Sequence, residues 1–115
     1  MAIVVVIKHL EKLEVKEVVL NGKLIVGQSV YCDVKLDDKL IANMQCQFQT
    51  TKCGHVLVTN LDLKREVLIN QARLKKSPLK SDDVLKIGSY VLSIDQSKLT
   101  PEELSVINAE YIEMV

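Results

Sequence analysis

The stretch that decides the fold is Ile25-Val26-Gly27-Gln28-Ser29-Val30-Tyr31-Cys32-Asp33-Val34. A glycine here interrupts one apolar run, and a second run containing a Cys-Asp pair follows it, which is typical of two short strands joined by a turn. Three further blocks of the same kind follow in order, at residues 41–46, 68–71 and 79–88. Together these blocks predict a small all-β recognition domain.

The length and charge of the chain limit what it can be. Its 115 residues are enough for one domain with one core, and 48% hydrophobic residues are typical of a folded globular chain. The formal net charge is zero, so the chain lacks the basic field that nucleic acid binding requires. Arginine provides most bidentate phosphate contacts in proteins, and only Arg65 and Arg73 are present. We therefore expect no direct binding to nucleic acid.

The cysteines and histidines predict neither disulfides nor a metal site. The three cysteines, Cys32, Cys46 and Cys53, are an odd number without paired spacing, which is typical of a reducing compartment inside the cell. His9 and His55 are far apart and have no ligand-like neighbours in the sequence. We interpret both as strand or turn residues and expect no metal and no cofactor.

The rest of the chain predicts many short strands. Apolar and polar residues alternate, and polar turns separate the runs; one of these turns, Asn21-Gly22, is typical of a tight hairpin. The predicted strands cover residues 13–19, 23–26, 30–36, 45–51, 55–60, 67–70, 73–74, 84–87 and 90–94. Short strands at this spacing favour an antiparallel β-sandwich over a βαβ fold.

The first strand is unusually apolar. Residues 2–7 are too few to span a bilayer and have no basic leader, so no membrane contact is expected. So many β-branched residues predict a strand that is buried on both faces or covered at its edge. Either the C-terminal part of the chain or a partner protein could provide the cover.

A single helix is predicted near the C-terminus. Thr100-Pro101-Glu102-Glu103 has the pattern of a capping box with proline in the first turn. Leu104, Ile107 and Tyr111 then fall on one face at helical spacing. We divide the chain into a sandwich over 1–95 and a linker with helix over 96–115, which packs on the domain or on a partner subunit.

In their order, these blocks resemble the forkhead-associated (FHA) domain, a β-sandwich whose loops at one end bind phosphothreonine. The family pattern begins with Gly-Arg, where this chain has Gly27-Gln28, and continues into a strand matched by Cys32-Asp33-Val34. Ala42-Asn43-Met44-Gln45 occupies the place of Ser-Arg-x-His. The resemblance therefore implies the fold, but the phosphate-binding residues differ.

The later blocks continue the resemblance over roughly residues 24–94. Residues 63–67 occupy the family's Ser-x-Asn-Gly-Thr loop, and 69–71 stand for Val-Asn-Gly. Residues 79–88 match Leu-x-x-Gly-Asp-x-Ile-x-Ile-Gly, with Asp82 in place of its glycine. The vestigial phosphopeptide site that the resemblance implies consists of Gln28, Ala42, Asn43, Lys64, Arg65 and Asn70.

These substitutions remove most of the charge from the site. A phosphothreonine carries nearly two negative charges and three acceptor oxygens. Gln28, Ala42 and Asn43 replace two cations and a hydroxyl, a loss on the order of 4 kcal/mol, or about a thousandfold in affinity. Lys39, Lys64 and Arg65 could form a displaced anion site, or they could be ordinary solvated loop charges.

The sequence therefore predicts a non-catalytic interaction domain. No nucleophile lies beside a histidine and no phosphate-binding glycine loop precedes a helix, so we expect neither an enzyme nor a small-molecule substrate. The low net charge, the apolar first strand and the amphipathic helix favour a homodimer. Its predicted surface is Val4, Val6, Leu104, Ile107 and Tyr111. The layout is similar to chromatin mediators of the DNA-damage checkpoint, which implies a nuclear adaptor with nuclear protein partners.

Overall fold

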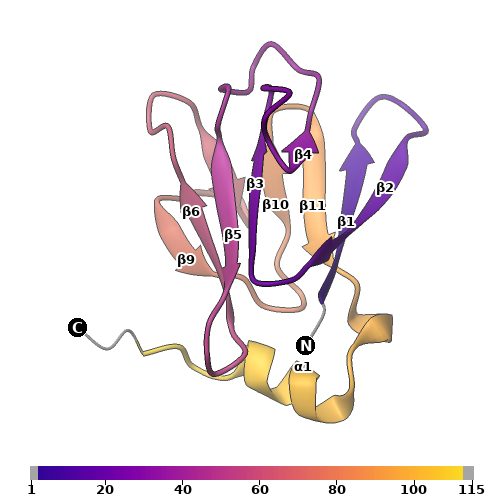
Figure 1. The fold of residues 1–115 in the computed structure, drawn as a ribbon, viewed down its shortest axis with the longest axis vertical. Helices are drawn as coiled ribbons and strands as arrows, with labels where there is room; N and C mark the ends of the chain where they lie inside the picture. The colour runs from indigo at the N-terminus through magenta and orange to yellow at the C-terminus, as the bar shows by residue number, and fades with distance from the viewer. Residues whose placement is uncertain (1–2, 113–115) are drawn as a thin grey trace.

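The computed structural model describes residues 3–112. Ala2 of the predicted first strand and residues 113–115 of the predicted C-terminal segment lie outside this range. Two sheets pack face to face as a sandwich, and the single α-helix lies across one end (Figure 1). One sheet has the order β2-β1-β11-β10-β7-β8 and the other β4-β3-β5-β6-β9. The elements are β1 Ile3–His9, β2 Val15–Leu20, β3 Lys23–Gly27, β4 Val34–Lys35, β5 Cys46–Thr50, β6 Val56–Asn60, β7 Val67–Ile69, β8 Ala72–Arg73, β9 Lys76–Pro78, β10 Leu85–Ile87, β11 Tyr90–Ile94, a 3₁₀ helix at Gln96–Lys98 and α1 Pro101–Asn108.

The predicted sandwich is confirmed, with two differences in the strands. The strand predicted over 30–36 is wrong for its first four residues, because Cys32 N–H donates to Ser29 O (3.1 Å) and closes a turn. Strand β9 was not predicted, since its three residues lack alternation and end in a proline. It pairs with β6 at the edge of the sheet, where a proline can be accommodated.

Alternation along the strands places one side chain in two in the core. In β1, Ile3, Val5 and Ile7 are fully buried, whereas Val4 and Val6 are half-buried on the outer face. Phe48 of β5 lies opposite Val58 of β6 in the other sheet and is also buried. Each such side chain contributes roughly 1.5–3 kcal/mol through removal of apolar surface from water. The sandwich is therefore held mainly by its inward residues.

The C-terminal helix packs on its own domain. The predicted capping box is confirmed: Glu103 N–H donates to Thr100 Oγ1 (3.1 Å), and Thr100 N–H donates to Glu103 Oε1 (2.9 Å). Ile107 is buried in the core with 1% of its surface exposed, so a partner subunit cannot reach it. The helix ends at Asn108, so Tyr111 is not on its face as predicted.

Tyr111 instead follows the helix in an extended segment. Its ring lies edge-on to the buried ring of His55, with centroids 5.4 Å apart. Both ring nitrogens of His55 lack a hydrogen-bond partner, so this contact with Tyr111 is apolar in character. The contact turns the Tyr111 ring toward its own domain. Of the predicted dimer surface, Val4, Val6, Leu104 and Tyr111 are partly exposed.

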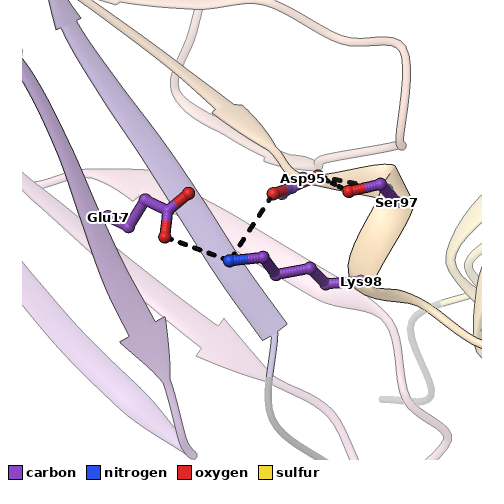
Figure 2. Close-up of polar contacts among 4 residues, drawn as sticks. All are labelled: Glu17, Asp95, Ser97 and Lys98. Carbon is purple, nitrogen blue, oxygen red and sulfur yellow. Dashed lines mark hydrogen bonds and ion pairs between the residues drawn. The ribbon is translucent and has the colours of Figure 1, made fainter.

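The linker before the helix is tied to the edge strand β2. The Lys98 ammonium lies 3.1 Å from Glu17 Oε2 and 4.0 Å from Asp95 Oδ2 (Figure 2). The hydrogen bond from the Ser97 hydroxyl to Asp95, with the nearby Lys98 charge, lowers the pKa of the Asp95 carboxyl despite desolvation. Because Lys98 and Glu17 are about half exposed, this ion pair positions the linker more than it stabilises the fold.

Asn108→Ala is expected to lower the free energy of unfolding by about 1–2 kcal/mol. Asn108 Oδ1 accepts hydrogen bonds from Ser81 N–H (3.0 Å) and from the Ser81 hydroxyl (3.1 Å), and Ser81 is buried. Truncation leaves that buried N–H without an acceptor. Urea unfolding should show the loss, while Ser105→Ala, an exposed change on the same helix, should stay within about 0.5 kcal/mol. Equal stability of the two variants would contradict this role of Asn108.

Candidate functional site

The loops at the end opposite α1, between β3 and β4, β4 and β5, and β6 and β7, form the apex of the sandwich (Figure 1). The first two loops are joined through their backbones. Gln28 N–H donates to Ala42 O (3.0 Å), and Ser29 N–H donates to Asn43 O (3.1 Å). The sequence-predicted residues Gln28, Ala42 and Asn43 are thus held side by side.

Gly27 permits this close contact. A Cβ at this position would lie 2.2 Å from Asn43 O, a backbone atom. The Cys32 thiol also donates to Asn43 O, at 3.0 Å. Only a glycine leaves room for the 41–45 loop to cross β3 at this distance.

Two buried amides support the apex from below. Gln45 is 1% exposed; its Oε1 accepts from Ala42 N–H (2.8 Å) and its Nε2 donates to Asn60 Oδ1 (2.8 Å). Asn60 Nδ2 in turn donates to Arg65 O (3.1 Å), which ties the β6–β7 loop to the same network. This role of Gln45 and Asn60 was not predicted from the sequence. The signal that could have indicated it is the amide of Asn60 at the end of an otherwise apolar strand.

Four of the predicted site residues line one groove of about 420 Å³ at the apex: Gln28, Ala42, Asn43 and Arg65. Ile41, Met44, Leu61 and Asp62 complete its lining. Asn70 lies elsewhere, in the turn between β7 and β8, where its side chain bonds Asp83 Oδ1 (2.7 Å) and Val84 N–H (2.9 Å). Its role in this structure is to join two turns.

The three candidate anion contacts lie near one another. Arg65 Nη1 donates to Lys39 O (2.9 Å), and Lys64 N–H donates to Asp62 Oδ1 (3.0 Å). All three cations are exposed, and within residues 3–112 none of them forms an ion pair. Asp62 lines the groove with Arg65, and Glu66 lines a neighbouring pocket with Arg65, so acidic residues accompany these cations.

Asp38 fixes the start of the 37–45 loop. Its carboxylate accepts from Leu40 N–H (2.8 Å) and Ser89 N–H (2.7 Å), which ties this loop to the β10–β11 turn. Partial burial alone would raise the pKa of the Asp38 carboxyl, but the hydrogen bonds from Leu40 and Ser89 outweigh it and lower that pKa.

Asp38→Asn is expected to lower the free energy of unfolding at pH 7 by about 1 kcal/mol, since an amide offers one acceptor oxygen where the carboxylate offers two. A carboxyl with a lowered folded-state pKa stabilises above its unfolded pKa of about 3.9 and loses this effect as the pH falls through the folded value. Thermal unfolding of both proteins should therefore differ at pH 7 and converge as the pH falls below the lowered folded-state pKa of Asp38. A constant difference over this range would contradict the assignment.

The outer face of the six-stranded sheet is a second candidate surface. In this face Val4 lies opposite Val19, Val6 lies opposite Glu17 and Ser93, and Lys8 lies opposite Val91. The apolar side chains on it, all partly or largely exposed, are Val4, Val6, Val15, Val19, Leu68, Val84 and Val91. No helix covers this face in the described residues, because α1 lies across the end of the sandwich (Figure 1).

The opposite sheet shows the contrast. Its outward positions carry Lys23, Gln47, Gln49, Thr59 and Lys76 together with Ile25, Leu57 and Pro78, and Leu57 is buried. The largely exposed apolar side chains on or beside the strands, Val15, Val19 and Val84, all belong to the six-stranded face.

Residues 3–112 contain neither a metal-binding cluster nor a membrane-spanning helix. Among the described residues no group of three His, Cys, Asp or Glu side chains could hold a metal ion. Across residues 3–112 no helix has the length and apolar character needed to cross a bilayer. Burial raises the pKa of the Cys46 thiol to about 12, so this cysteine is an inert core residue.

The FHA domain model matches residues 24–88, more than half of the chain, and the chain belongs to the FHA domain family. The FHA domain of the CT664 protein from Chlamydia trachomatis has a TM-score of 0.72 at 18% identity, covering 82% of this chain and 96% of that one. The Mycobacterium tuberculosis Rv1747 FHA-1 domain has a TM-score of 0.62 at 13% identity, covering 84% and 100%. No curated protein sequence matches the chain.

A third solved structure, a Rad53 fragment of residues 1–466 bound to AMP-PNP, has a TM-score of 0.69 at 14% identity; the match covers 82% of this chain and 29% of that one. FHA domains are non-catalytic protein–protein interaction modules that typically bind phosphothreonine. The fold is therefore that of an interaction domain, and the identity of the apex residues bears on what it binds.

Proposed function

We propose that this domain no longer recognises phosphothreonine and instead mediates homodimerisation. The observation that carries the proposal is the apolar outer face of the six-stranded sheet, centred on Val6. A sheet face exposed to water is normally polar. A face this apolar in a folded chain is typical of a surface that another protein covers.

The apex supports the first half of the proposal. Gln28 and Asn43 are neutral, and Ala42 is buried and has no hydroxyl. Neutral hydrogen bonds contribute about half of what charge-assisted ones contribute. A dianionic side chain in this groove would be desolvated with only Arg65 among the groove-lining residues to balance it.

Charge placement favours a second copy as the partner. A two-fold axis parallel to the strands would set the β2 edge of one copy over the β10–β8 side of the other. Glu17 would then face the side that carries Lys86 and Arg73, while Val4 and Val6 of β1 would face the β10–β7 side that carries Leu68. Each apolar residue of the face contributes to such an interface from both copies.

The test is the solution mass. Multi-angle light scattering and sedimentation equilibrium should give twice the 12.9 kDa of one chain at micromolar concentration. A monomer at 200 μM would overturn the proposal. A phosphothreonine peptide library should yield no binder in the same buffer.

One observation favours a second candidate, a phosphopeptide reader with a rewired pocket. Lys39, Lys64 and Arg65 lie close together at the apex, and the groove reaches Arg65. If phosphothreonine peptides bind, Arg65→Gln should abolish the interaction and Arg73→Gln, at the other arginine of the chain, should not. If no peptide of the phosphothreonine library binds, the phosphopeptide-reader function is excluded.

The layout similar to checkpoint mediators supports a proposed setting: a nuclear adaptor of the DNA damage response that acts on chromatin. The domain would then be an assembly unit for a longer protein. A tagged full-length protein should concentrate in nuclei and at sites of DNA breaks, and cytoplasmic staining before and after irradiation would exclude this setting.

A further inference from the structure

Strand β2 forms an open edge of the six-stranded sheet. It pairs with β1 over all six of its residues without interruption. The other three sheet edges are shorter: β4 and β8 have two residues each, and β9 has three and ends in a proline. Among the described residues, no strand or helix lies on the far side of β2, at the right of Figure 1. Of the four edges, β2 therefore has the length that pairing with a further strand requires.

The outward backbone groups of β2 belong to every second residue. His9 N–H donates to Glu14 O (3.2 Å), which makes these two residues a hydrogen-bonded pair of the antiparallel ladder. Such pairs alternate along a ladder, so the even-numbered residues of β2 turn their N–H and C=O groups toward β1. On the other side of β1, Val4 O accepts from Asp95 N–H (2.9 Å), as this alternation requires. The residues of β2 whose backbone groups point away from the sheet are Val15, Glu17 and Val19.

These outward groups are available to a partner. Within residues 3–112 no hydrogen bond reaches them, and the contact of Lys98 with Glu17 is between side chains. The β1–β2 hairpin also carries four apolar side chains with more than half of their surface exposed: Leu10, Leu13, Val15 and Val19. An edge with unpaired backbone groups and apolar side chains is a template for the addition of another strand.

A second copy of β2 fits this edge poorly. When two identical strands pair antiparallel about a two-fold axis, the residue at the centre lies opposite itself. A centre at Lys16 or Glu17 sets like charges opposite each other, which is destabilising. A centre at Val15 runs into the turn that precedes the strand, and a centre at Val18 or Val19 leaves both charges without an opposite charge across from them. The occupant is therefore better sought in a different sequence.

The two charges of β2 define that sequence. An acidic residue opposite Lys16 and a basic residue opposite Glu17 form favourable cross-strand pairs, and the reverse arrangement sets like charges against each other. Each of these side chains forms an exposed ion pair within the chain and stays about half exposed, so a partner can still approach it. Opposite Val15 and Val19, β-branched residues would cover the exposed valines.

We propose that β2 binds an extended segment of another protein as an added antiparallel strand. The segment carries an acidic residue opposite Lys16, a basic residue opposite Glu17 and β-branched residues opposite Val15 and Val19. Backbone hydrogen bonds hold it, and the two charges fix its register. The bond-forming groups lie in the plane of the sheet, so this site is separate from the apex loops and does not depend on the proposed dimer, although the two valines also belong to the dimer face.

The probe is a fluorescein-labelled nonapeptide with the central residues Val-Thr-Lys-Glu-Val, and the control exchanges its lysine and glutamate. Antiparallel pairing sets the lysine opposite Glu17 and the glutamate opposite Lys16. Fluorescence polarisation with the full chain should show saturable binding of the probe, and the control should bind about fivefold more weakly or less. Equal affinity of the two peptides, or no binding of the probe at about 1 mM protein, would overturn the proposal.

Methylation of the peptide backbone tests strand addition itself. In the proposed register the N–H of the peptide lysine points toward β2, and the N–H of the adjacent glutamate points away from it. N-methylation of the lysine should weaken binding about tenfold or more, and N-methylation of the glutamate should change it by less than about twofold. An equal effect at the two positions would show that the backbone does not pair with β2.

Amide hydrogen exchange locates the bound segment. The probe should slow exchange at the outward amides of Val15, Glu17 and Val19, which lack a partner in the free protein. Slower exchange confined to the apex loops would overturn the proposal. So would slower exchange at the β2 amides that grows with protein concentration in the absence of peptide, because a second copy would then occupy the edge.

A charge reversal tests the register. Glu17→Lys should bind a peptide with the central residues Val-Thr-Glu-Glu-Val more tightly than the original probe, because the glutamate now lies opposite a lysine. Glu66→Lys adds the same charge change at an exposed position beside β7, toward the other edge of the same sheet, and should keep the preference of the wild type. A Glu17→Lys protein that still prefers the original probe would contradict the proposed pairing.

Discussion

Val6→Glu is expected to convert the proposed dimer into a monomer, with a loss of self-affinity of at least a hundredfold. Val6 lies near the middle of the outer face, between Glu17 of β2 and Ser93 of β11. A two-fold interface contains the substitution twice, so two added carboxylates would be buried in the interface, each opposite Glu17 of its own copy. Leaving a charge unpaired in an interface costs several kcal/mol, of which about 2.7 kcal/mol already gives a hundredfold change.

Sedimentation equilibrium of both proteins at the same concentrations measures this effect. Val30→Glu is the matched control, because it adds the same charge at an exposed valine in the apex, away from the sheet face. The control should keep the mass of the wild type. A dimeric Val6→Glu protein would show that the dimer uses another face, whereas a monomeric wild type would remove the dimer itself.

Gly27→Ala is expected to lower the free energy of unfolding by about 3 kcal/mol or more. The added Cβ would meet Asn43 O at 2.2 Å and Asn43 C at 2.8 Å, and both are backbone atoms that no side-chain rotation can move away. Relief requires the 41–45 loop to separate from β3. That shift breaks the hydrogen bonds of Gln28 to Ala42 and of Ser29 to Asn43.

Guanidinium chloride unfolding followed by circular dichroism measures the loss. Val30→Ala, three residues further along, changes an exposed side chain and should stay within about 0.5 kcal/mol of the wild type. If the free energy of unfolding of Gly27→Ala falls by less than 1 kcal/mol, the 41–45 loop can shift at little cost in free energy. The close contact at Gly27 would then not hold the apex groove in place.

The all-β fold could be predicted because its signals are local. The continuous run of β-branched residues at 3–7 predicted a strand, and Ile3, Val5 and Ile7 are buried, whereas Val4 and Val6 are half-buried. The Asn21-Gly22 turn and the capping box at Thr100 each depend on a few adjacent residues, and Gly22 has the positive φ of 90° that the turn requires. Where the local signal was mixed, at residues 30–33, a turn replaced the expected strand.

The site could be predicted only in part. Gln28, Ala42, Asn43 and Arg65 do line one groove, as the ordered resemblance implied. Asn70 shares the family spacing but serves to join two turns through Asp83 and Val84. Spacing along the chain gives the order of the loops, but it does not give the direction in which each side chain points.

The sequence by itself determined the β-sandwich, the capped helix and the neutral residues Gln28, Ala42 and Asn43 of the apex, because strand patterning, capping and side-chain chemistry are properties of neighbouring residues. Only the tertiary structure decided that Ile107 lies in the core, that Arg65 is oriented by Lys39, and that the valines of three strands and a turn gather with Leu68 on one face. These contacts join residues that are mostly far apart in the chain, and their formation depends on strand pairing and sheet packing rather than on any local preference.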